Sequence, residues 1–227
     1  MQASAPDRVR SRFRDKAQAF DDLYEDERPL VKLLRPGLLR RRQLAVDTVH
    51  SYGNPRVLDV GCGSGRIGEF VLDAGAADYV GIDFSEPMLA LARERLERFG
   101  DRVRLIEGDF HDTPLAGQFG VVLALGLFDY LAEPQRTIER LAEMCAPDGC
   151  VVGSFPAWSW FKGPIRKVRY EWIGDCPIFD YTTGGVEAMF AAAGLPHVEV
   201  PVSGRSGFIA RAARRPRAAT GPPGHPG

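Results

Sequence analysis

A carboxylate directly before three closely spaced glycines is the feature of this sequence most able to do chemistry. Residues 57–65 read Val-Leu-Asp-Val-Gly-Cys-Gly-Ser-Gly, in which Asp59 lies near the end of a short apolar run. Such a run is typical of a buried parallel strand, and glycines let the backbone turn sharply and approach a ligand closely. A helical pattern follows from Arg66 to Ala74 and ends at Gly75. This order of strand, glycine loop and helix predicts a nucleotide-like pocket at the carboxyl edge of an α/β sheet.

Two kinds of cofactor fit this glycine spacing. Gly63, Gly65 and Gly68 match the G-x-G-x-x-G pattern of dinucleotide binding. Asp83 follows about twenty residues later, as expected of an acid that binds a ribose. Asp59 argues against a dinucleotide, because a carboxylate at the strand tip would repel a pyrophosphate seated on the helix N-terminus. The same carboxylate suits a ligand that carries an ammonium group.

The segment 57–65 resembles the first motif of the class I S-adenosylmethionine-dependent methyltransferases, and the resemblance covers residues 50–212. It implies S-adenosylmethionine as the cofactor, with the glycine loop passing its methionine part. It also implies that Asp83 binds the ribose hydroxyls and that Asp109 faces the adenine amino group. The cofactor-binding residues expected on this basis are Asp59, Gly61, Cys62, Gly63, Gly65, Asp83, Phe84, Met88, Gly108, Asp109, Phe110, Leu125 and Gly126.

Hydrophobic patterns predict alternating strands and helices along the rest of the chain. The expected fold class is α/β, with a Rossmann-like, seven-stranded, mostly parallel sheet, helices on both faces and an N-terminal helical cap. Strands are expected over 57–60, 79–82, 103–106, 119–125 and 150–155, followed by a hairpin-like pair over 197–202 and 207–212. Helices are expected over 66–74, between Ser85 and Gly100, and over 134–145 and 185–193.

Length and composition favour one such domain. The 227 residues, of which 44% are hydrophobic, suffice to bury one α/β core. We expect a helical cap or lid over 1–49, a methyltransferase domain over 50–213 with an insertion at 156–181, and a disordered tail over 214–227.

The same composition predicts the setting and partners of the protein. A net charge of −1 gives no reason to expect nucleic acid as a partner. No apolar run is long enough to span a membrane, and the four cysteines do not show the spacing of a metal site. We therefore expect a cytoplasmic protein without a metal, either a monomer or a homodimer. A basic run, Arg40-Arg41-Arg42, is interpreted as a solvated helix face, with a contact to a polyanion as the alternative.

Recognition of the methyl acceptor is expected from two segments outside the shared core. In residues 1–49, Tyr24 either closes over the cofactor or packs on the sheet. The insertion at 156–181 holds all three tryptophans together with lysines and arginines, which suits a flat acceptor bearing a carboxylate or phosphate. Alternatively, the tryptophans pack the insertion onto the sheet and its cations face water. The candidate substrate contacts are Tyr24, Tyr130, Trp158, Arg166, Arg169 and Tyr170.

Methyl transfer asks mainly for positioning of the nucleophile and exclusion of water. A general base is needed only if the acceptor is protonated at neutral pH, and His111 and Tyr130 are the candidates by location. For His111 the alternative is an ordinary surface loop. The Asn-Pro-Pro-Tyr-type motif of nucleic-acid N-methyltransferases does not follow the strand at 119–125, which disfavours a nucleobase acceptor.

The predicted function is transfer of a methyl group to an O, N or C nucleophile of a small molecule. The N-terminal helices and the closing segment Ser206-Gly207-Phe208 resemble those of magnesium-protoporphyrin and ubiquinone-pathway O-methyltransferases, but the insertion departs from both. The alternatives are an NAD(P)-dependent oxidoreductase and a non-catalytic, cofactor-binding member of the methyltransferase fold.

Overall fold

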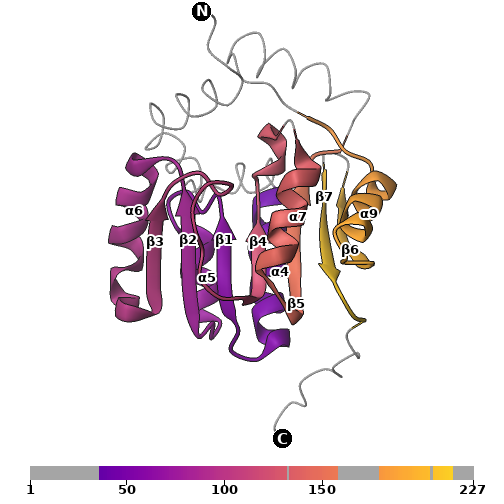
Figure 1. Ribbon diagram of the computed structural model, residues 1–227. Helices are drawn as coiled ribbons and strands as arrows, with labels where there is room; N and C mark the ends of the chain where they lie inside the picture. The colour runs from indigo at the N-terminus through magenta and orange to yellow at the C-terminus, as the bar shows by residue number, and fades with distance from the viewer. Residues whose placement is uncertain (1–35, 132, 158–178, 205–206, 217–227) are drawn as a thin grey trace, which may run out of the picture.

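Seven strands form a single sheet in the order β3-β2-β1-β4-β5-β7-β6 (Figure 1). The computed structural model describes residues 36–131, 133–157, 179–204 and 207–216. Strands β1 to β5 run parallel to one another, and β7 pairs antiparallel with both β5 and β6. The predicted seven-stranded, mostly parallel sheet is therefore confirmed. The strands are β1 (Arg56–Val60), β2 (Asp78–Asp83), β3 (Val103–Glu107), β4 (Phe119–Ala124), β5 (Cys145–Phe155), β6 (His197–Gly204) and β7 (Gly207–Ala213).

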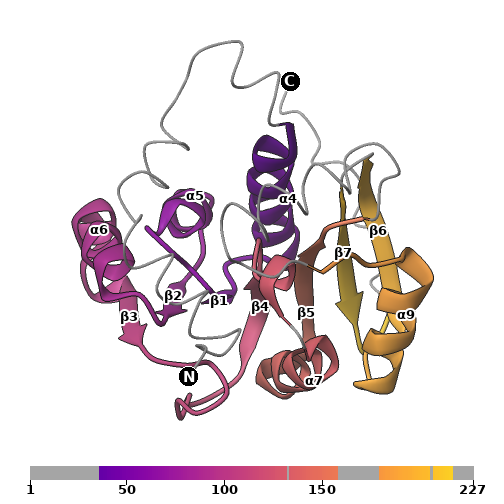
Figure 2. The ribbon, with the colours of Figure 1, turned by 90° about the horizontal axis from the view of Figure 1, so that it is seen from above.

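Helices cover both faces of this sheet (Figure 2). Helices α4, α5 and α6 lie on one face, and α7 and α9 lie on the other. Among the helices that the structure describes, none is both long and apolar enough to cross a membrane. Their bounds are α4 (Pro36–Tyr52), α5 (Arg66–Asp73), α6 (Glu86–Leu96), α7 (Pro134–Met144) and α9 (Thr183–Ala192), with short 3-10 helices η1 (Glu97–Arg102) and η2 (Phe128–Tyr130).

The core consists of two hydrophobic layers, because successive residues of a central strand point to opposite faces. Val57 of β1 packs in the layer beneath α4 and α5, together with Leu72. The next residue, Leu58, packs in the layer beneath α7 and α9, together with Ile138. Burial on both faces explains why these strands read as continuous apolar runs in the sequence.

Helix α4 crosses the boundary expected between residues 49 and 50 and packs directly on the sheet. Its residues Leu44, Ala45 and Val49 are buried in the same layer as α5. Residues 1–35 of the expected cap, including Tyr24, lie outside the described residues, as do Trp158, Arg166, Arg169 and Tyr170 of the insertion.

Strand β5 begins five residues earlier than the pattern indicated. Phe119 pairs with Cys145, after which the register shifts and Val121 pairs with Cys150. The Pro-Asp-Gly segment at 147–149 is therefore an irregularity within the strand, of the kind that bulges produce where extra residues enter one side of a ladder.

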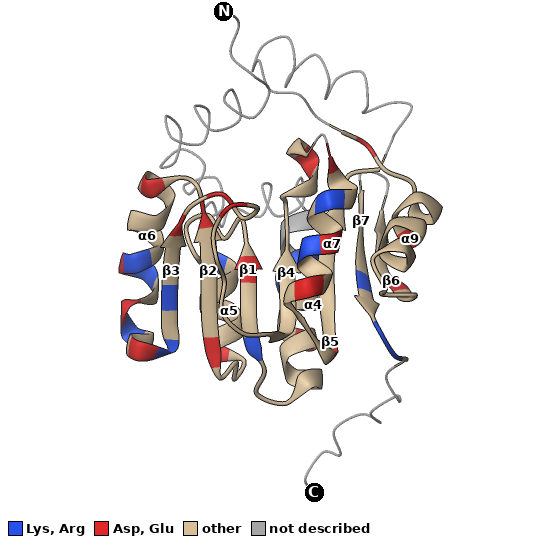
Figure 3. Ribbon diagram, viewed as in Figure 1, with Lys and Arg blue, Asp and Glu red and all other residues tan. Residues whose placement is uncertain are grey.

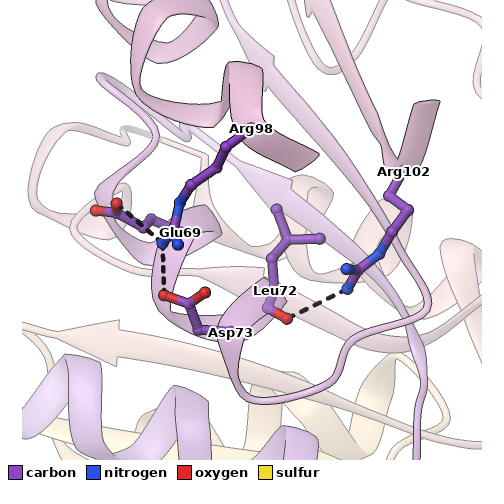
Figure 4. A network of polar contacts seen from close by, with 5 residues as sticks. All are labelled: Glu69, Leu72, Asp73, Arg98 and Arg102. Atoms are coloured by element: carbon purple, nitrogen blue, oxygen red, sulfur yellow. Dashed lines mark hydrogen bonds and ion pairs between the residues drawn. The ribbon is translucent and has the colours of Figure 1, made fainter. Parts of the chain in front are cut away.

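Polar contacts fasten α5 to the segment after α6 (Figure 4). The Arg98 guanidinium donates to Asp73 Oδ2 at 2.7 Å and to Glu69 Oε1 at 3.3 Å. Arg102 donates to the carbonyl of Leu72 at 3.2 Å, near the α5 C-terminus, where a cation is favoured by the helix dipole. These contacts hold α5, which begins at the glycine loop, against the η1 segment.

Candidate functional site

The carboxyl ends of β1 and β4 lie at the point where the strand order reverses, and ligands of open α/β sheets bind at such switch points. The glycine loop at 61–65 follows β1 at this edge. Figure 3 shows acidic residues in β1, β2 and β3 toward the same edge. Sequence motifs from several strands therefore converge on one side of the sheet.

Backbone hydrogen bonds fix the glycine loop against the end of β2. The N–H groups of Gly61 and Cys62 donate to the carbonyl of Ile82, at 2.8 and 3.2 Å. The Gly63 N–H donates to Asp83 Oδ2 at 2.9 Å. The φ values of the three glycines at 61, 63 and 65 are 73°, 53° and 75°. Residues other than glycine rarely adopt positive φ values of this kind. The loop thus depends on its glycines for backbone conformation.

Gly63 and Gly65 serve different purposes within this loop. A Cβ added at Gly65 would lie 3.1 Å from Ala92 Cβ and from Leu96 Cδ1, so this glycine allows close packing against α6. A Cβ added at Gly63 would have no neighbour within 4 Å in the described structure. Gly63 therefore borders open space, as expected of the position where a ligand passes.

Asp83, at the end of β2, is buried but keeps capacity for further hydrogen bonds. Its Oδ1 accepts from the Ser85 N–H at 2.9 Å, in addition to the contact of Oδ2 with Gly63. The Phe84 backbone also donates to this carboxylate. A carboxylate has about four acceptor sites, so three backbone donors leave capacity for a hydroxyl group. Burial raises the pKa of Asp83, and the backbone N–H groups partly offset this. The hydroxyl of Ser85 is buried and makes no hydrogen bond in the described structure.

Asp59 is also buried, and its described hydrogen bond comes from Tyr79 of β2. Its Oδ2 accepts from the Tyr79 hydroxyl at 2.8 Å, and its exposed fraction is 3%. The pKa of Asp59 is raised to about 7. Burial is the main cause and the nearby Asp83 adds to it, while the hydrogen bond from Tyr79 opposes the rise. The neighbouring thiol of Cys62 is buried too, and burial raises its pKa well above the usual value. The expected contact of Asp59 with a ligand ammonium thus stays a prediction.

The residues after β3 form a turn beside Asp83. The Gly108 N–H donates to the Asp83 carbonyl at 3.0 Å, and Asp109 Oδ1 accepts from the His111 N–H at 2.9 Å. Phe110 is buried in the core, with the Arg140 guanidinium 5.2 Å from its ring centroid. The turn therefore brings Asp109 to the same sheet edge as Asp83.

Helix α6, which follows Asp83, contributes the remaining expected residues on this side. Met88, in its first turn, is buried. Phe84 precedes the helix and is half-buried. The expected cofactor residues from β1, β2 and β3 thus all lie at or near one edge of the sheet.

Arg41 lies at the carboxyl edge beside Gly126, whereas the sequence analysis interpreted its basic run as a solvated helix face. Leu125 and Gly126 follow β4, and a Cβ added at Gly126 would lie 2.9 Å from Arg41 Nη1. Arg41 Nη2 also lies 3.8 Å from Asp129 Oδ2, with a quarter of the Arg41 side chain exposed. Because the helix before β1 runs antiparallel to it, the start of that helix falls at the carboxyl edge. The basic run could have been placed there from the sequence.

The two candidate bases come from different parts of this edge. His111 Nε2 lies 3.0 Å from the Thr137 hydroxyl of α7. The pKa of His111 is lowered, chiefly by burial and also by Arg136. Tyr130 is half-buried in η2, directly after β4, and its N–H donates to the Leu127 carbonyl at 3.1 Å. Tyr130 thus lies on the β4 side and His111 on the β3 side.

Both ends of the insertion at 156–181 meet beside the segment after β4. Ala157 and Tyr181 form an isolated parallel bridge, and the Tyr181 N–H donates to the Pro156 carbonyl at 2.8 Å. The Phe179 N–H donates to the Asp129 carbonyl at 3.1 Å. The described ends of the insertion are therefore anchored at the carboxyl edge of the sheet.

Comparison with known proteins identifies the family. Residues 57–149 match the family model described as "Methyltransferase domain". The chain is 30% identical over 145 residues to a ubiquinone biosynthesis O-methyltransferase of Azoarcus sp. (strain BH72), covering 62% of this chain and 58% of the relative. It is 36% identical over 121 residues to a demethylmenaquinone methyltransferase of Thermus thermophilus, covering 52% of this chain and 55% of the relative.

The fold is also similar to that of a methyltransferase of known structure. A crystal structure of magnesium protoporphyrin IX methyltransferase from Synechocystis PCC 6803, with bound SAH, superimposes with a TM-score of 0.75 at 18% identity. The alignment covers 93% of this chain and all of that one. The chain belongs to the class I S-adenosylmethionine-dependent methyltransferases.

The family model matches the part of the chain that holds the expected cofactor residues, and the segments expected to bind the acceptor lie outside it. Residues 57–149 contain the glycine loop and every expected cofactor residue from Asp59 to Gly126. Helix α4 with Arg41, the insertion, and strands β6 and β7 lie outside the match. The chain spans between half and two thirds of these two relatives. Within the described residues there is no cluster of His, Cys, Asp and Glu that could hold a metal ion.

Proposed function

We propose that this protein transfers a methyl group from S-adenosylmethionine to an O, N or C nucleophile of a small molecule. The observation that carries the proposal is the pair of buried carboxylates, Asp59 and Asp83, beside a glycine loop with open space at Gly63. Carboxylate oxygens accept hydrogen bonds and attract positive charge, so cationic or hydroxyl-bearing ligands are favoured there. A dinucleotide pyrophosphate would instead face two acids.

The residues present fit this cofactor. Asp83 has acceptor capacity for a ribose hydroxyl, and Asp109 lies at the neighbouring strand end for the adenine amino group. Gly63 leaves room for the methionine part. Arg41, at the opposite side of the switch point, supplies a guanidinium for the α-carboxylate, a pairing that charge-assisted hydrogen bonds favour.

When bound, S-adenosylmethionine supplies a sulfonium-activated methyl group for in-line displacement. The chain's own residues bind and orient the two reactants and exclude water. A base is required only for an acceptor that is protonated at neutral pH, and Tyr130 and His111 are the proposed candidates. The lowered pKa of His111 keeps its ring neutral at pH 7, the form that can accept a proton.

We propose that the insertion at 156–181 contributes to acceptor binding. Its anchoring beside β4 supports this role, and Trp158, Arg166, Arg169 and Tyr170 are its proposed contacts, with Tyr24 from the N-terminal segment. The names of the relatives include ubiquinone biosynthesis and demethylmenaquinone, which makes a quinol-type phenol the first acceptor to test. A cytoplasmic location and a monomeric or homodimeric state belong to the same proposal.

Ligand-dependent melting tests the cofactor first. We expect S-adenosylhomocysteine to raise the melting temperature and NADH to leave it unchanged, because a ligand stabilises the state that binds it. The reverse result would favour the oxidoreductase alternative. Formation of S-adenosylhomocysteine from S-adenosylmethionine in the presence of a panel of phenols, amines and carboxylic acids then tests catalysis. Cofactor binding without turnover of any acceptor would favour the non-catalytic alternative.

A further inference from the structure

Tyr79 of β2 is a fully buried tyrosine whose hydroxyl contacts both Asp59 and the Cys62 side chain. Its exposed fraction is 0%, and the hydroxyl donates to Asp59 Oδ2 at 2.8 Å. A buried hydroxyl needs such a partner, because an unmade hydrogen bond in the core costs free energy. The contact links the strand that precedes the glycine loop to the strand that ends in Asp83.

Two glycines on different elements make room for the Tyr79 ring. A Cβ added at Gly68 of α5 would lie 2.6 Å from Tyr79 Cζ, and one added at Gly81 of β2 would lie 3.0 Å from Tyr79 Cε1. Glycine within a helix or strand weakens that element. A smaller apolar residue at position 79 would avoid this cost, so packing alone does not account for a tyrosine here.

We propose that Tyr79 is a positioning residue for the cofactor pocket, holding the Asp59 carboxylate in place and charged behind the glycine loop without touching the cofactor. The inference rests on the proposed function. In a poorly hydrated site, a fixed negative charge attracts the ammonium group of the amino-acid part more strongly than in water. Tyr79 then acts on cofactor affinity through Asp59.

The electrostatic surroundings agree with this role. Burial and the nearby Asp83 carboxylate both raise the pKa of Asp59, to about 7, while the hydrogen bond from Tyr79 lowers it. The Cys62 thiol and the Tyr79 phenol remain neutral, because burial raises the pKa of each well above its usual value. Among these described neighbours, Tyr79 is the group that favours the charged form.

Calorimetric titration of S-adenosylhomocysteine between pH 6 and 9 tests the inference in four proteins: the wild type, Tyr79→Phe, Asp59→Asn and the double variant. Tyr79→Phe keeps the ring and removes the hydroxyl. We expect wild-type affinity to rise with pH around 7, as Asp59 ionises. In Tyr79→Phe the affinity at pH 7.5 falls roughly fivefold to tenfold and the rise moves to higher pH, because a hydrogen bond to a charged group is lost.

The double variant separates positioning from packing. If Tyr79 acts through Asp59, removing the hydroxyl in the Asp59→Asn background costs less than about twofold. An equal loss in both backgrounds, or an unmoved pH dependence in Tyr79→Phe, overturns the inference. Tyr181→Phe is the matched control: it removes a half-buried hydroxyl that donates to the carbonyls of Phe128 and Leu131, and the pH dependence of affinity stays at its wild-type position.

A second measurement needs no altered tyrosine. The carboxyl carbon of Asp59, assigned by its loss in Asp59→Asn, is titrated by ¹³C NMR with and without S-adenosylhomocysteine. We expect the ligand to lower the pKa of Asp59, and an unchanged pKa overturns the inference. Absence of any S-adenosylhomocysteine binding to the wild type would overturn the proposed function, and this inference with it. If the wild type binds S-adenosylhomocysteine and the pH dependence of affinity in Tyr79→Phe equals that of the wild type, only this inference is overturned.

Discussion

The two halves of the sheet build their parts of the site in different ways. On the β1–β3 side, the glycine loop and the acids Asp59, Asp83 and Asp109 each follow or end a strand within short, contiguous motifs. On the β4–β7 side, Arg41 reaches the end of β4 from a helix that precedes β1, where it meets Asp129. One half depends on local sequence, and the other depends on how distant segments pack.

Aromatic packing shows the same contrast. Phe155 at the end of β5 stacks on Phe128 with ring centroids 4.3 Å apart and on Phe208 of β7 at 5.6 Å. Tyr181 from the far end of the insertion meets Phe155 at 5.5 Å. Four segments thus supply one aromatic cluster, beneath the region proposed for the acceptor. The comparison teaches that cofactor chemistry is readable from motifs, whereas acceptor chemistry is a property of the assembled fold.

The largest expected effect is at Gly63. We predict that Gly63→Val weakens S-adenosylhomocysteine binding more than about 100-fold, because a β-branched side chain resists a positive φ and fills the open space beside the loop. Gly75→Val is the control, since Gly75 has a φ of 96° and open space as well, but lies after α5. Calorimetry and circular dichroism on both variants measure this. Near-normal binding by folded Gly63→Val would show that the loop glycines serve packing alone.

A smaller loss is expected at Asp83. Hydrogen bonds to charged groups contribute about 1.5–3 kcal/mol, so we predict that Asp83→Ala weakens S-adenosylhomocysteine binding roughly tenfold to a hundredfold. Asp78→Ala, at the other end of β2 where Asp78 pairs with Arg56 at 2.8 Å, should leave the affinity unchanged. An equal affinity of Asp83→Ala and wild type would remove Asp83 from the site.

The sequence predicted the sheet and the cofactor side because their signals are local. Apolar runs that contain Asp59 or end in Asp83, followed by glycines or by the start of a helical pattern, determine strand, loop and helix within a few residues. The burial of Asp59 against Tyr79 was not predicted, because it requires the pairing of β1 with β2 and the space left by Gly68. The same pairing information would have placed Tyr79 next to Asp59 on one face of the sheet.

The acceptor side was less predictable for a physical reason. The direction of α4 places Arg41 at the carboxyl edge, but its position over Gly126 also depends on the strand order, which no local pattern specifies. The proposed contacts Arg166 and Arg169 lie outside the described residues and stay predictions.

The next prediction concerns the stability cost of the buried acid. A carboxyl group with a pKa of about 7 in the folded state, against an ordinary pKa of 3.8, binds a proton more tightly when folded. Its stabilising contribution is therefore complete below pH 4 and is lost as the pH rises toward 7. Asp59→Asn removes this loss, so we predict that the free energy of unfolding rises by roughly 2–4 kcal/mol at pH 8 and changes little at pH 4.

Urea unfolding at the two pH values measures this difference. Asp129→Asn is the matched control from the other half of the sheet, because the Asp129 side chain is 21% exposed and pairs with Arg41. A stabilisation of Asp59→Asn that is the same at pH 4 and pH 8 would contradict the assignment to the buried charge. A large pH-dependent gain in Asp129→Asn would remove the contrast between the two halves.

The smallest expected effect is at Arg41, and it tests whether the β4 side also contributes to cofactor binding. Arg41 is partly exposed, so its interaction with the α-carboxylate is screened by solvent. We predict that Arg41→Gln weakens S-adenosylhomocysteine binding roughly threefold to tenfold. Methylthioadenosine lacks the amino and carboxylate groups, and its affinity should be unchanged. Added salt should narrow the difference between wild type and Arg41→Gln, because exposed charges are screened over about 10 Å at 0.1 M.

Arg42 provides the control for Arg41 within the same basic run. Its guanidinium lies 3.6 Å from the centroid of the Phe70 ring, on α5, so Arg42→Gln should leave the affinity of both ligands at the wild-type value. If Arg41→Gln weakens methylthioadenosine and S-adenosylhomocysteine equally, Arg41 supports the fold of the site and does not recognise the carboxylate. If Arg41→Gln binds both ligands with wild-type affinity while acceptor turnover falls, Arg41 contributes to acceptor binding alone. The two halves of the sheet are then more sharply divided in function than proposed.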